Sequence, residues 1–462
     1  MIVRNKGYVF NADGTPNGKT LLNSIQEFRA GLDRMHTLEA AYKNEHAICN
    51  RVRDKKLPNN RMAHGYAKYI TTLASGYLIG EPIAYTASDD NDQNAALQPI
   101  LEAYRHTDID SVDGELATAA SIYGVAVEIV FADESAEPRS ASIDPKTAFV
   151  IYDDTVLNNP LIGVHIVRTY DNNHQPNGYA VTAYTDRAAY LYTVTDLDQL
   201  ETETPNSVTP HYFDGVPLIE YWNNADTSGD FEQVLGEIDA YDALQSDRVN
   251  DKQQFVDTLL VVFGASIAPD EEGRTPMQQL AEDRSLFLPD GTGAQYLSKS
   301  LDESGVEILR KSIASDIHKF ALVPDMSDQE FAGNVSGEAM KYKLLGLEQL
   351  TRKKEEQFRL ALKDRLRLYA AFLGMRNGRA LDVGCVTIAF TRSLPVNEFE
   401  LSQTARNLKG IIPDQNILAM LPFVQDVNAA MEQMEEQRRQ EIEAQRQAFG
   451  GYDDVQAAND ED

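Results

Sequence analysis

Hydrophobic positions recur at helical spacing in the first eighty residues of the chain. One stripe runs from Leu21 to Met35, and a second runs from Tyr66 to Leu73. Apolar residues three and four positions apart share one face of a helix, so both stretches predict helices. Pro82 and the β-prone residues after it predict an extended segment at the end of this helical region.

Between about residues 112 and 222 the pattern changes to β-branched and aromatic runs. Polar turn clusters such as Asp171–Asn173 and Asn177–Gly178 separate the runs. This pattern predicts a mixed or antiparallel sheet in one α+β lobe. The strand candidates are Val125–Phe131, Ala148–Tyr152, Leu161–Tyr170, Tyr179–Tyr184 and Ala189–Val194.

A long helical pattern follows the predicted sheet. It runs from Phe231 to Leu260 without a proline, and about thirty residues of helix extend roughly 45 Å. Prolines and glycines interrupt it over residues 266–303, where Ser285–Leu288 is a strand candidate. A shorter helix is expected over Val306–Leu322, and it stops at the proline that follows.

A second long helix is expected after a polar loop. Ser336 is the expected N-cap, and apolar residues lie along one stripe over 337–373, a length of roughly 55 Å. A short extended segment over 385–390 and further helices over 396–448 complete the pattern. Two helices of this length predict an elongated subunit that packs its sides against neighbours, rather than a compact enzyme.

The composition predicts a folded, soluble, non-exported protein of several domains. The chain has 462 residues, of which 42% are hydrophobic and 25% charged, with no long apolar run and no apolar core of a secretion signal near the start. Forty-two basic residues face seventy-two acidic ones, a net charge of -30. Tight binding to DNA phosphates needs a basic footprint, so any DNA partner is expected to be held loosely.

The sequence offers no anchor for catalysis or for a cofactor. The two cysteines are far apart, the eight histidines have no metal-ligand spacing, and no phosphate-binding loop is present. Ala380–Cys385 resembles the opening of a methyltransferase cofactor motif but lacks its further glycines, so a plain strand is the favoured interpretation. We therefore expect no enzyme, no metal and no cofactor.

The chain has two basic segments, of which the first is a candidate nucleic-acid contact. The first contains Arg51, Arg53, Lys55, Lys56 and Arg61. Charge runs are more often solvated faces than binding sites, so this is the minor hypothesis. In the second, over 341–367, basic residues alternate with acidic ones, which predicts salt-bridged packing.

Taken in order, five segments resemble the portal proteins of long-tailed bacteriophages, and the likeness covers nearly the whole chain. The segment at 211–264 is the most specific, with Val-Pro, Asn-Asn, Asp-Phe, Ile-Asp-Ala-Tyr and Ser-Asp in order. The other segments are HGYAKYITTLASGYLIGEPIAYT at 64–86, SIYGVAVEIVFADESAEPRSASIDPKTAFVIYDD at 121–154, NVSGEAMKYKLLGLEQLTRKKEEQF at 334–358 and FTRSLPVNEFELSQTARNLKGIIPDQNILAMLPFVQD at 390–426.

The resemblance implies the portal fold: a ring-forming α+β subunit with an α/β wing, long stem and wing helices, a small clip and a helical crown. The implied division is an N-terminal region and wing at 1–240, stem helices at 241–266 and 304–323, a clip at 267–303, a tunnel loop at 324–335, a long wing helix and strand at 336–395, a crown at 396–450 and an acidic, disordered tail at 451–462.

The resemblance also implies a function. Twelve subunits would form the channel at one capsid vertex, through which the terminase motor packages double-stranded DNA without sequence specificity. The ring would also contact a head-completion adaptor and the major capsid and scaffolding proteins, in the virion and, during assembly, in the host cytoplasm, without a membrane partner. The polar, acidic loop between two helices suggests the residues that face DNA: Asp325, Asp328, Gln329, Glu330 and Asn334.

Two other functions remain as alternatives. A capsid-associated adaptor or scaffold-binding protein would also be built of long helices but would form no closed ring. A methyltransferase would require binding of S-adenosylmethionine.

Overall fold

The chain forms two compact units. The computed structural model describes residues 1–55, 57–87, 91–256, 259–263, 293–297, 303–327, 337–392, 398–419, 431, 433–434, 436–440 and 442. The first unit contains Met1–Met326 and Leu344–Ser393, and the second contains Ser327–Lys343 and Leu394–Asp462. Within the described part of the chain, no helix is long and apolar enough to cross a membrane.

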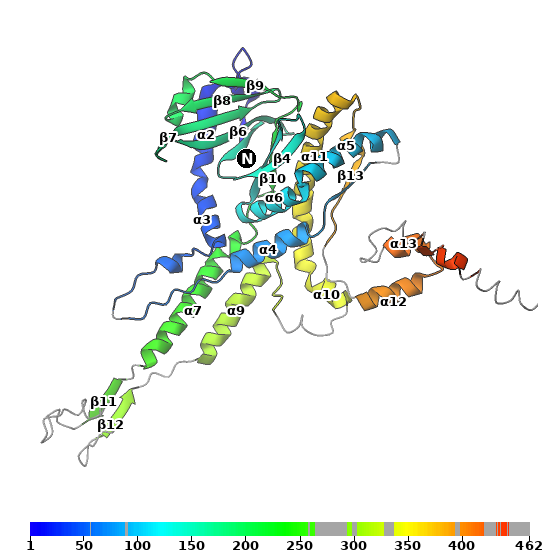
Figure 1. The fold of residues 1–462 in the computed structure, drawn as a ribbon. Helices are drawn as coiled ribbons and strands as arrows, with labels where there is room; N and C mark the ends of the chain where they lie inside the picture. The colour runs from blue at the N-terminus through cyan, green and yellow to red at the C-terminus, as the bar shows by residue number, and fades with distance from the viewer. Residues whose placement is uncertain are drawn as a thin grey trace, which may run out of the picture. The chain divides into compact units, whose positions relative to one another are not determined.

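A six-stranded sheet forms one half of the first unit (Figure 1). β1 is parallel to β5, and the remaining neighbours are antiparallel. Helix α2 (Gly18–Ala30) covers one face, where Ile25 is fully buried and Phe28 stacks on Phe149 with ring centroids 4.6 Å apart. In spatial order, the strands are Ile2–Arg4 (β1), Ala148–Asp153 (β5), Pro160–Tyr170 (β6), Pro176–Tyr184 (β7), Ala188–Val194 (β8) and Ser207–Pro210 (β9).

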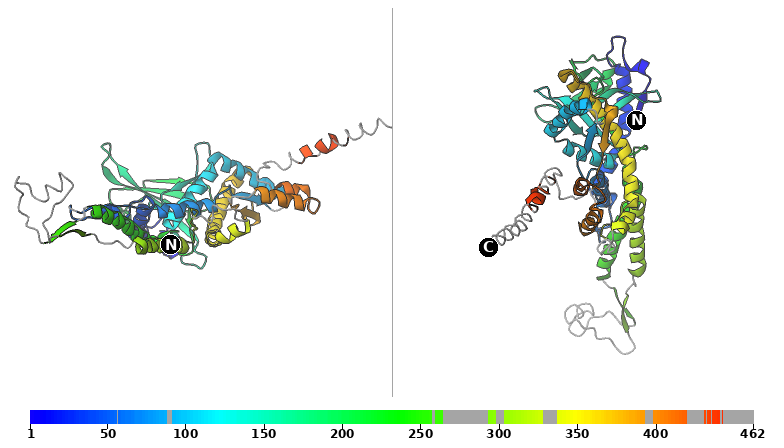
Figure 2. Two further views of the ribbon diagram at one scale, coloured as in Figure 1. Left: turned by 90° about the horizontal axis from the view of Figure 1, so that it is seen from below. Right: turned by 90° about the vertical axis from the view of Figure 1, so that its right-hand side faces the viewer.

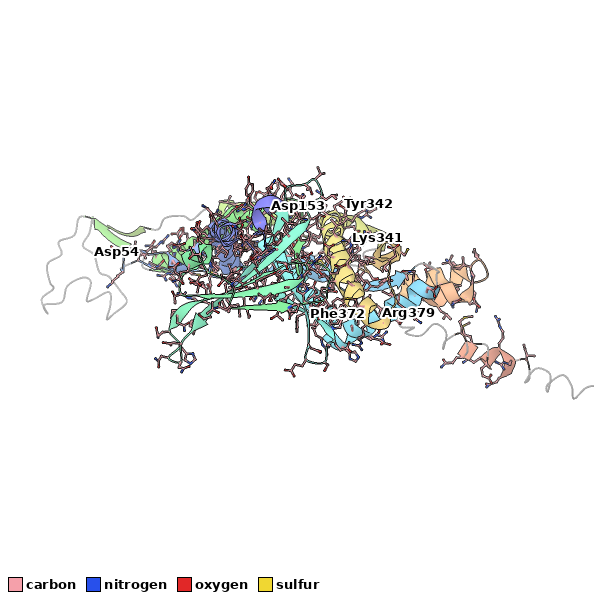
Figure 3. The ribbon with its side chains drawn as sticks, turned by 90° about the horizontal axis from the view of Figure 1, so that it is seen from above. Asp54, Asp153, Lys341, Tyr342, Phe372 and Arg379 are labelled. Atoms are coloured by element: carbon pink, nitrogen blue, oxygen red, sulfur yellow. The ribbon has the colours of Figure 1, made fainter. Side chains whose placement is uncertain are left out.

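Aspartates close the turns between these strands. Asp153, labelled in Figure 3, accepts hydrogen bonds from the backbone amides of Thr155 (3.2 Å) and Asn159 (2.9 Å). Asp171 does the same for Asn173 and Gln175, both at 2.8 Å. Because these side chains replace missing backbone partners, Asp171–Asn173 acts as the turn that the sequence predicts. The prediction of a turn at Asn177–Gly178 is wrong, since both residues lie within β7 and Gly178 pairs with Thr169 of β6.

A three-stranded antiparallel sheet lies beside the first one. Its order is β10 (Leu218–Trp222), β3 (Val125–Ala132) and β4 (Pro138–Ile143). Helix α6 (Ile109–Tyr123) leads into β3 through Gly124, whose φ is 83°. A Cβ there would lie 1.9 Å from a backbone oxygen, so only glycine fits this turn.

All five strand candidates are confirmed, but the sheet region was drawn too wide. Residues 112–123 are helical, because Leu116, Ala117 and Ala120 share one buried face at helical spacing. The strands β4, β9 and β10 were not among the candidates.

The expected N-terminal helices are present, although the stripe from Leu21 to Met35 is divided at Gly31 into two helices, and further helical elements join them. The remaining short and helical elements of this part are α1 (Lys6–Val9), α3 (Leu32–Tyr42), η1 (Ala47–Asn50), α4 (Tyr66–Leu78), α5 (Asn91–Thr107), η2 (Leu197–Glu201) and η3 (Glu232–Val234).

Two long helices, α7 (Leu235–Val256) and α9 (Glu303–Ala321), lie side by side and lead to a two-stranded ribbon (Figures 1 and 2). The ribbon pairs β11 (Leu259–Phe263) with β12 (Gly293–Leu297). The prediction that the first helix continues to residue 260 is wrong, because the Leu-Leu-Val-Val-Phe run favours a strand. The strand candidate Ser285–Leu288 and most of 267–303 lie outside the described residues.

The expected helix over 337–373 is two helices. α10 (Gly337–Lys343) belongs to the second unit, and α11 (Leu345–Asn377) to the first. α11 ends at Gly378, whose φ of 65° allows the left-handed cap. The proposed N-cap, Ser336, lies outside the described residues.

The segment after α11 returns to the first unit. β13 (Val386–Ala389) pairs with β2 (Ala84–Ala87), so the two expected extended segments meet. The methyltransferase-like residues do not form the favoured strand: Val383–Cys385 is a 3-10 turn (η4), in which Asp382 accepts a hydrogen bond from Gly384 at 2.8 Å. The second unit also contains α12 (Glu398–Leu408) and α13 (Asp414–Ala419).

A buried ion cluster connects α11 to the rest of the first unit. Arg365 is fully buried, with Nη1 2.7 Å from Asp113 of α6 and Nε 2.8 Å from Glu128 of β3. The hydroxyl of Tyr221 donates to Glu128 at 2.6 Å. Burial raises the pKa of Asp113 to about 6, although Arg365 opposes that shift. The cluster therefore links helices α11 and α6 to strands β3 and β10.

A second buried cation lies three turns earlier on α11. Lys354 pairs with Asp230, which also accepts from Ser121 (2.5 Å) and Asn223 (2.7 Å). Burying a charge is favourable only when such partners compensate it, and here every partner lies in the same unit.

Replacing Arg365 by methionine should destabilise the first unit by about 3–5 kcal/mol, because two buried carboxylates lose their cation. Arg367→Met is the matched control, since Arg367 is exposed on the same helix and its replacement should cost less than about 0.5 kcal/mol. Chemical denaturation of both variants measures this. Equal stability of the two would contradict the role of the buried cluster.

Candidate functional site

Ion pairs hold α7 and α9 together near the ribbon. Arg248 lies 3.2 Å from Glu303 and 3.0 Å from Glu307, and Arg310 lies 2.7 Å from Glu307. The hydrogen bond from Arg310 lowers the pKa of Glu307 to about 2, so this carboxylate remains charged at neutral pH. Arg310 also donates to the hydroxyl of Tyr241 at 3.2 Å. Ion pairs therefore cross-link the two helices near the ribbon, and the bond from Arg310 to Tyr241 extends this link toward the first turns of α7.

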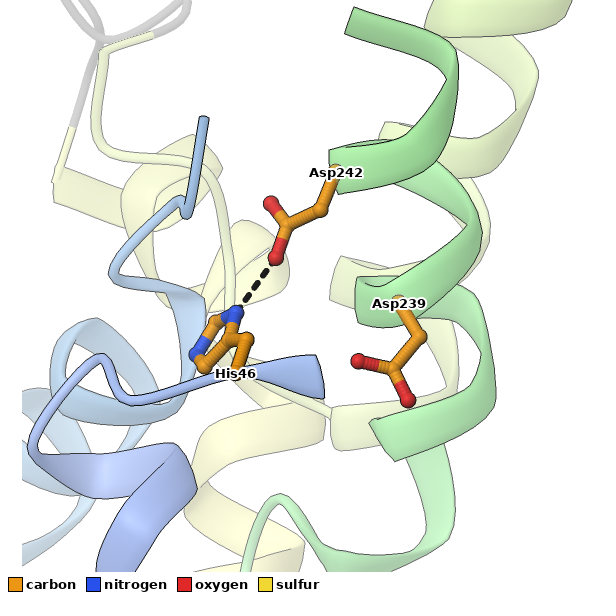
Figure 4. Close-up of side chains that lie close together, drawn as sticks. All are labelled: His46, Asp239 and Asp242. Atoms are coloured by element: carbon orange, nitrogen blue, oxygen red, sulfur yellow. Dashed lines mark hydrogen bonds and ion pairs between the residues drawn. The ribbon is translucent and has the colours of Figure 1, made fainter. Parts of the chain in front are cut away.

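At the other end of α7, Asp242 binds two histidines. It is fully buried, and its Oδ2 forms a short hydrogen bond with Nδ1 of the buried His46. Its Oδ1 accepts from the amide of His64 at 2.9 Å and contacts Nδ1 of His64 at 2.7 Å. Figure 4 shows His46 and Asp242 pointing toward each other, with Asp239 one turn away on α7.

His46, Asp239 and Asp242 are also close enough to be considered as metal ligands, with their ligand atoms within 4.8 Å of one another. Two ligand atoms on one tetrahedral ion stand about 3.3 Å apart, which follows from metal–nitrogen distances near 2 Å. The contact between His46 and Asp242 is much shorter than that, and nitrogen donors already occupy both oxygens of Asp242. The geometry fits a hydrogen bond between His46 and Asp242 rather than a bound ion.

The histidines anchor the loop over 43–65 to α7, and other polar contacts extend that anchor. The amide of Asn60 donates to Asn250 at 2.7 Å, and the amide of Met62 donates to Ser246 at 2.9 Å. The loop therefore lies along α7 from Asp242 to Asn250, held in part through its own backbone amides.

The basic cluster of this loop has partners within the chain. Arg51 and Arg53 both pair with Asp247, the first at 2.8 Å, and Arg61 donates to the carbonyl of Cys49 at 2.8 Å. Lys55 is exposed, and Lys56 lies outside the described residues. Arg51, Arg53 and Arg61 thus contribute to packing within the chain. This agrees with the general rule that a run of charged residues is seldom a binding site.

Of the five residues expected to face DNA, the structure describes one. Asp325 follows α9, with Oδ2 3.9 Å from Nε2 of His318. Asp328, Gln329, Glu330 and Asn334 lie outside the described residues, so their assignment stays a prediction. Sequence analysis missed His46, Asp242 and Tyr69, because their contacts join residues about two hundred positions apart that no local pattern connects.

Comparison with known families decides the identity of the chain. The model of the family described as phage portal protein, SPP1 Gp6-like, matches residues 22–444. The chain belongs to this portal protein family. Membership confirms the expected function: this is a portal protein of a tailed phage, a non-enzymatic structural protein of the virion portal vertex.

Individual portal proteins show the same similarity. That of Bacillus phage SPP1 is 25% identical over 428 residues, covering 87% of this chain and 82% of the relative. That of Clostridium phage phiCD119 is 20% identical over 386 residues, covering 80% and 83%. A solved structure described as the neck of an empty GTA particle computed with C6 symmetry has a TM-score of 0.44 and 12% identity, covering 78% of this chain and 90% of that one.

The anchor of the 43–65 loop in this portal protein should depend on pH. The hydrogen bond with Asp242 raises the pKa of His46 above its usual 6.5, so the folded protein favours the protonated histidine. This stabilisation is complete at pH values below the pKa of His46 in the unfolded chain, and it is lost as the pH rises through the pKa of His46 in the folded protein. Amide exchange over 43–65, corrected for its intrinsic pH dependence, should therefore increase several-fold from about pH 6 to about pH 9.

Two aspartate variants test the source of this dependence. Asp242→Asn keeps an oxygen for the amide of His64 but removes the charge, so the pH dependence should disappear. Asp239→Asn, on the same helix, should retain most of it. Protection that does not change with pH in the unmodified protein would refute the anchor.

Proposed function

We propose that this portal protein assembles into a dodecameric ring whose channel passes double-stranded DNA during packaging by the terminase motor, and later joins the head to the tail and releases the genome. The wing, stem, clip, tunnel loop and crown would follow the division given above. The partners would be the motor, the head-completion adaptor, and the capsid and scaffolding proteins, in the host cytoplasm and then in the virion.

The two-stranded ribbon is the observation that most supports a ring. Its strands pair only with each other among the described residues, so each has an outer edge without a backbone partner. An isolated two-stranded ribbon is marginally stable in water, and unpaired edges attract other strands. Neighbouring subunits placed around a ring would supply those partners.

The surface of α9 supports the same arrangement. Ile308 is 70% exposed and Leu309 is 50% exposed, and Phe320 is exposed two turns beyond the middle of the helix. Adjacent apolar residues in water favour burial against another surface. A helix pair that is charged on its inner contacts and exposes these three apolar side chains fits packing between copies.

The acidic balance of the chain supports a channel through which DNA slides. Counterion release makes basic surfaces hold DNA tightly, and a chain with a net charge of -30 offers little of that attraction. Screening confines charge effects to about 8 Å at physiological salt, so the residues of the channel wall are the ones that matter.

Ring assembly is tested by negative-stain microscopy and the mass in solution. The unmodified protein should form rings with a central hole, many times the 51.4 kDa subunit. Ile308→Asp should reduce ring formation while leaving the subunit folded. Met375→Asp is the matched control, because Met375 is a similarly exposed residue (61%) at the end of α11. A folded monomer from the unmodified protein, with no rings in the presence of its scaffolding protein, would contradict the proposal.

The tunnel-loop assignment has a separate test. Deleting residues 328–334 should leave the rings intact but impair DNA packaging in an assembly assay, because the segment that faces DNA is lost. Unchanged packaging with intact rings would reject the assignment of Asp328, Gln329, Glu330 and Asn334.

A further inference from the structure

A single tyrosine hydroxyl holds the backbone on both sides of Asp325. The hydroxyl of Tyr69, on α4, donates to the carbonyl of Pro324 at 2.9 Å and accepts from the amide of Met326 at 2.8 Å. A phenolic hydroxyl has one proton to donate and lone pairs to accept with, so both bonds can form at once. The chain on either side of Asp325 is therefore fixed to one atom of α4.

His318 supports this contact from α9. Its Nδ1 faces the carbonyl of Val323 at 3.1 Å and therefore carries the proton in that bond. Its ring meets that of Tyr69 edge-on, with centroids 5.6 Å apart and an interplanar angle of 89°. The histidine thus fixes both the tyrosine ring and the backbone that the tyrosine hydroxyl binds.

The backbone between α9 and this contact has little freedom. Leu322 adopts a left-handed conformation with φ of 58°, which is uncommon for a branched residue, and the ring of Pro324 fixes its own φ. Met326 is the last residue of the first compact unit, and Ser327 belongs to the second. The contacts of Tyr69 and His318 therefore act at the point where the chain leaves the first unit.

We propose that Tyr69 is a positioning residue for the acidic segment that begins at Asp325: with His318, it sets the direction in which the backbone leaves the first unit. The inference rests on the proposed function of that segment in the DNA channel. Neither residue touches DNA in this proposal. They determine where the segment starts.

The test is the Tyr69→Phe variant of the full-length protein, assembled into its oligomeric ring. The substitution keeps the aromatic contact with His318 and removes both hydrogen bonds. Hydrogen exchange over 322–327 should become faster, on the order of tenfold at the amide of Met326. Ring mass and unfolding temperature should not change, whereas packaging should fall several-fold. A loss of packaging without a loss of assembly is a result that a purely stabilising residue would not give.

Tyr77→Phe is the matched control, because Tyr77 lies on the same helix but stacks under Arg392 instead. It should leave exchange over 322–327 unchanged. His318→Phe is a second variant that keeps an aromatic edge contact and removes the bond to Val323, so it should also accelerate exchange over 322–327.

The outcomes separate this inference from the proposed function. Unchanged exchange in both Tyr69→Phe and His318→Phe would overturn the contact itself, and faster exchange with normal packaging would overturn the positioning role. If deletion of 328–334 also leaves packaging normal, the assignment of the segment fails as well. In that case, exchange over 322–327 still reports whether Tyr69 holds the backbone.

Discussion

The buried position of Arg365 is the constraint on which the first unit depends. One guanidinium compensates Asp113 of α6 and Glu128 of β3, and Tyr221 of β10 completes the bonding of Glu128. These groups would be costly to bury separately, so the helix and the sheet can pack closely only when α11 brings its cation between them. The apolar residues of α11 then fill the space around the charges, as Phe358, Leu362 and Leu366 do.

The position of α11 in turn fixes the segments that lead into the helix pair α7–α9 and out of the first unit. Lys354 on the same helix binds Asp230, directly before the start of the long helix α7. Arg392, near the end of the first unit, pairs with Glu348 at 3.3 Å and lies over the ring of Tyr77. Arg34 of α3 also donates to the carbonyl of Thr227 at 2.9 Å. Buried and half-buried cations therefore fix the segments that lead into the helix pair and out of the unit.

The local sequence pattern is sufficient to predict most helices and strands, but it does not predict the contacts between them. The strands with alternating residues and the helices with apolar stripes were predictable, because each signal lies within a few neighbouring residues. Residues 112–123 were misassigned because small alanines carry a weak helical stripe beside a strong strand at Val125. Leu259–Phe263 continues the apolar pattern of the preceding helix in the sequence but forms a strand in the structure. Periodicity alone does not distinguish a helix from a strand in so short an apolar run. Arg365 and Tyr69 find partners 237 and 255 positions away, and only the folded chain brings these residues together.

The distribution of charge follows from the same packing. The chain has far fewer basic than acidic residues, yet several of the basic ones lie inside the first unit or in its loops, bound to carboxylates. Cations paired in this way are less available to phosphates, although each pair also takes up a carboxylate and leaves the net charge of -30 unchanged. In the proposed channel, a wall built from such subunits would attract DNA weakly, and this would permit movement in both directions without a strongly bound intermediate. The internal salt bridges that organise the fold would therefore also keep several basic side chains from binding a passing polyanion.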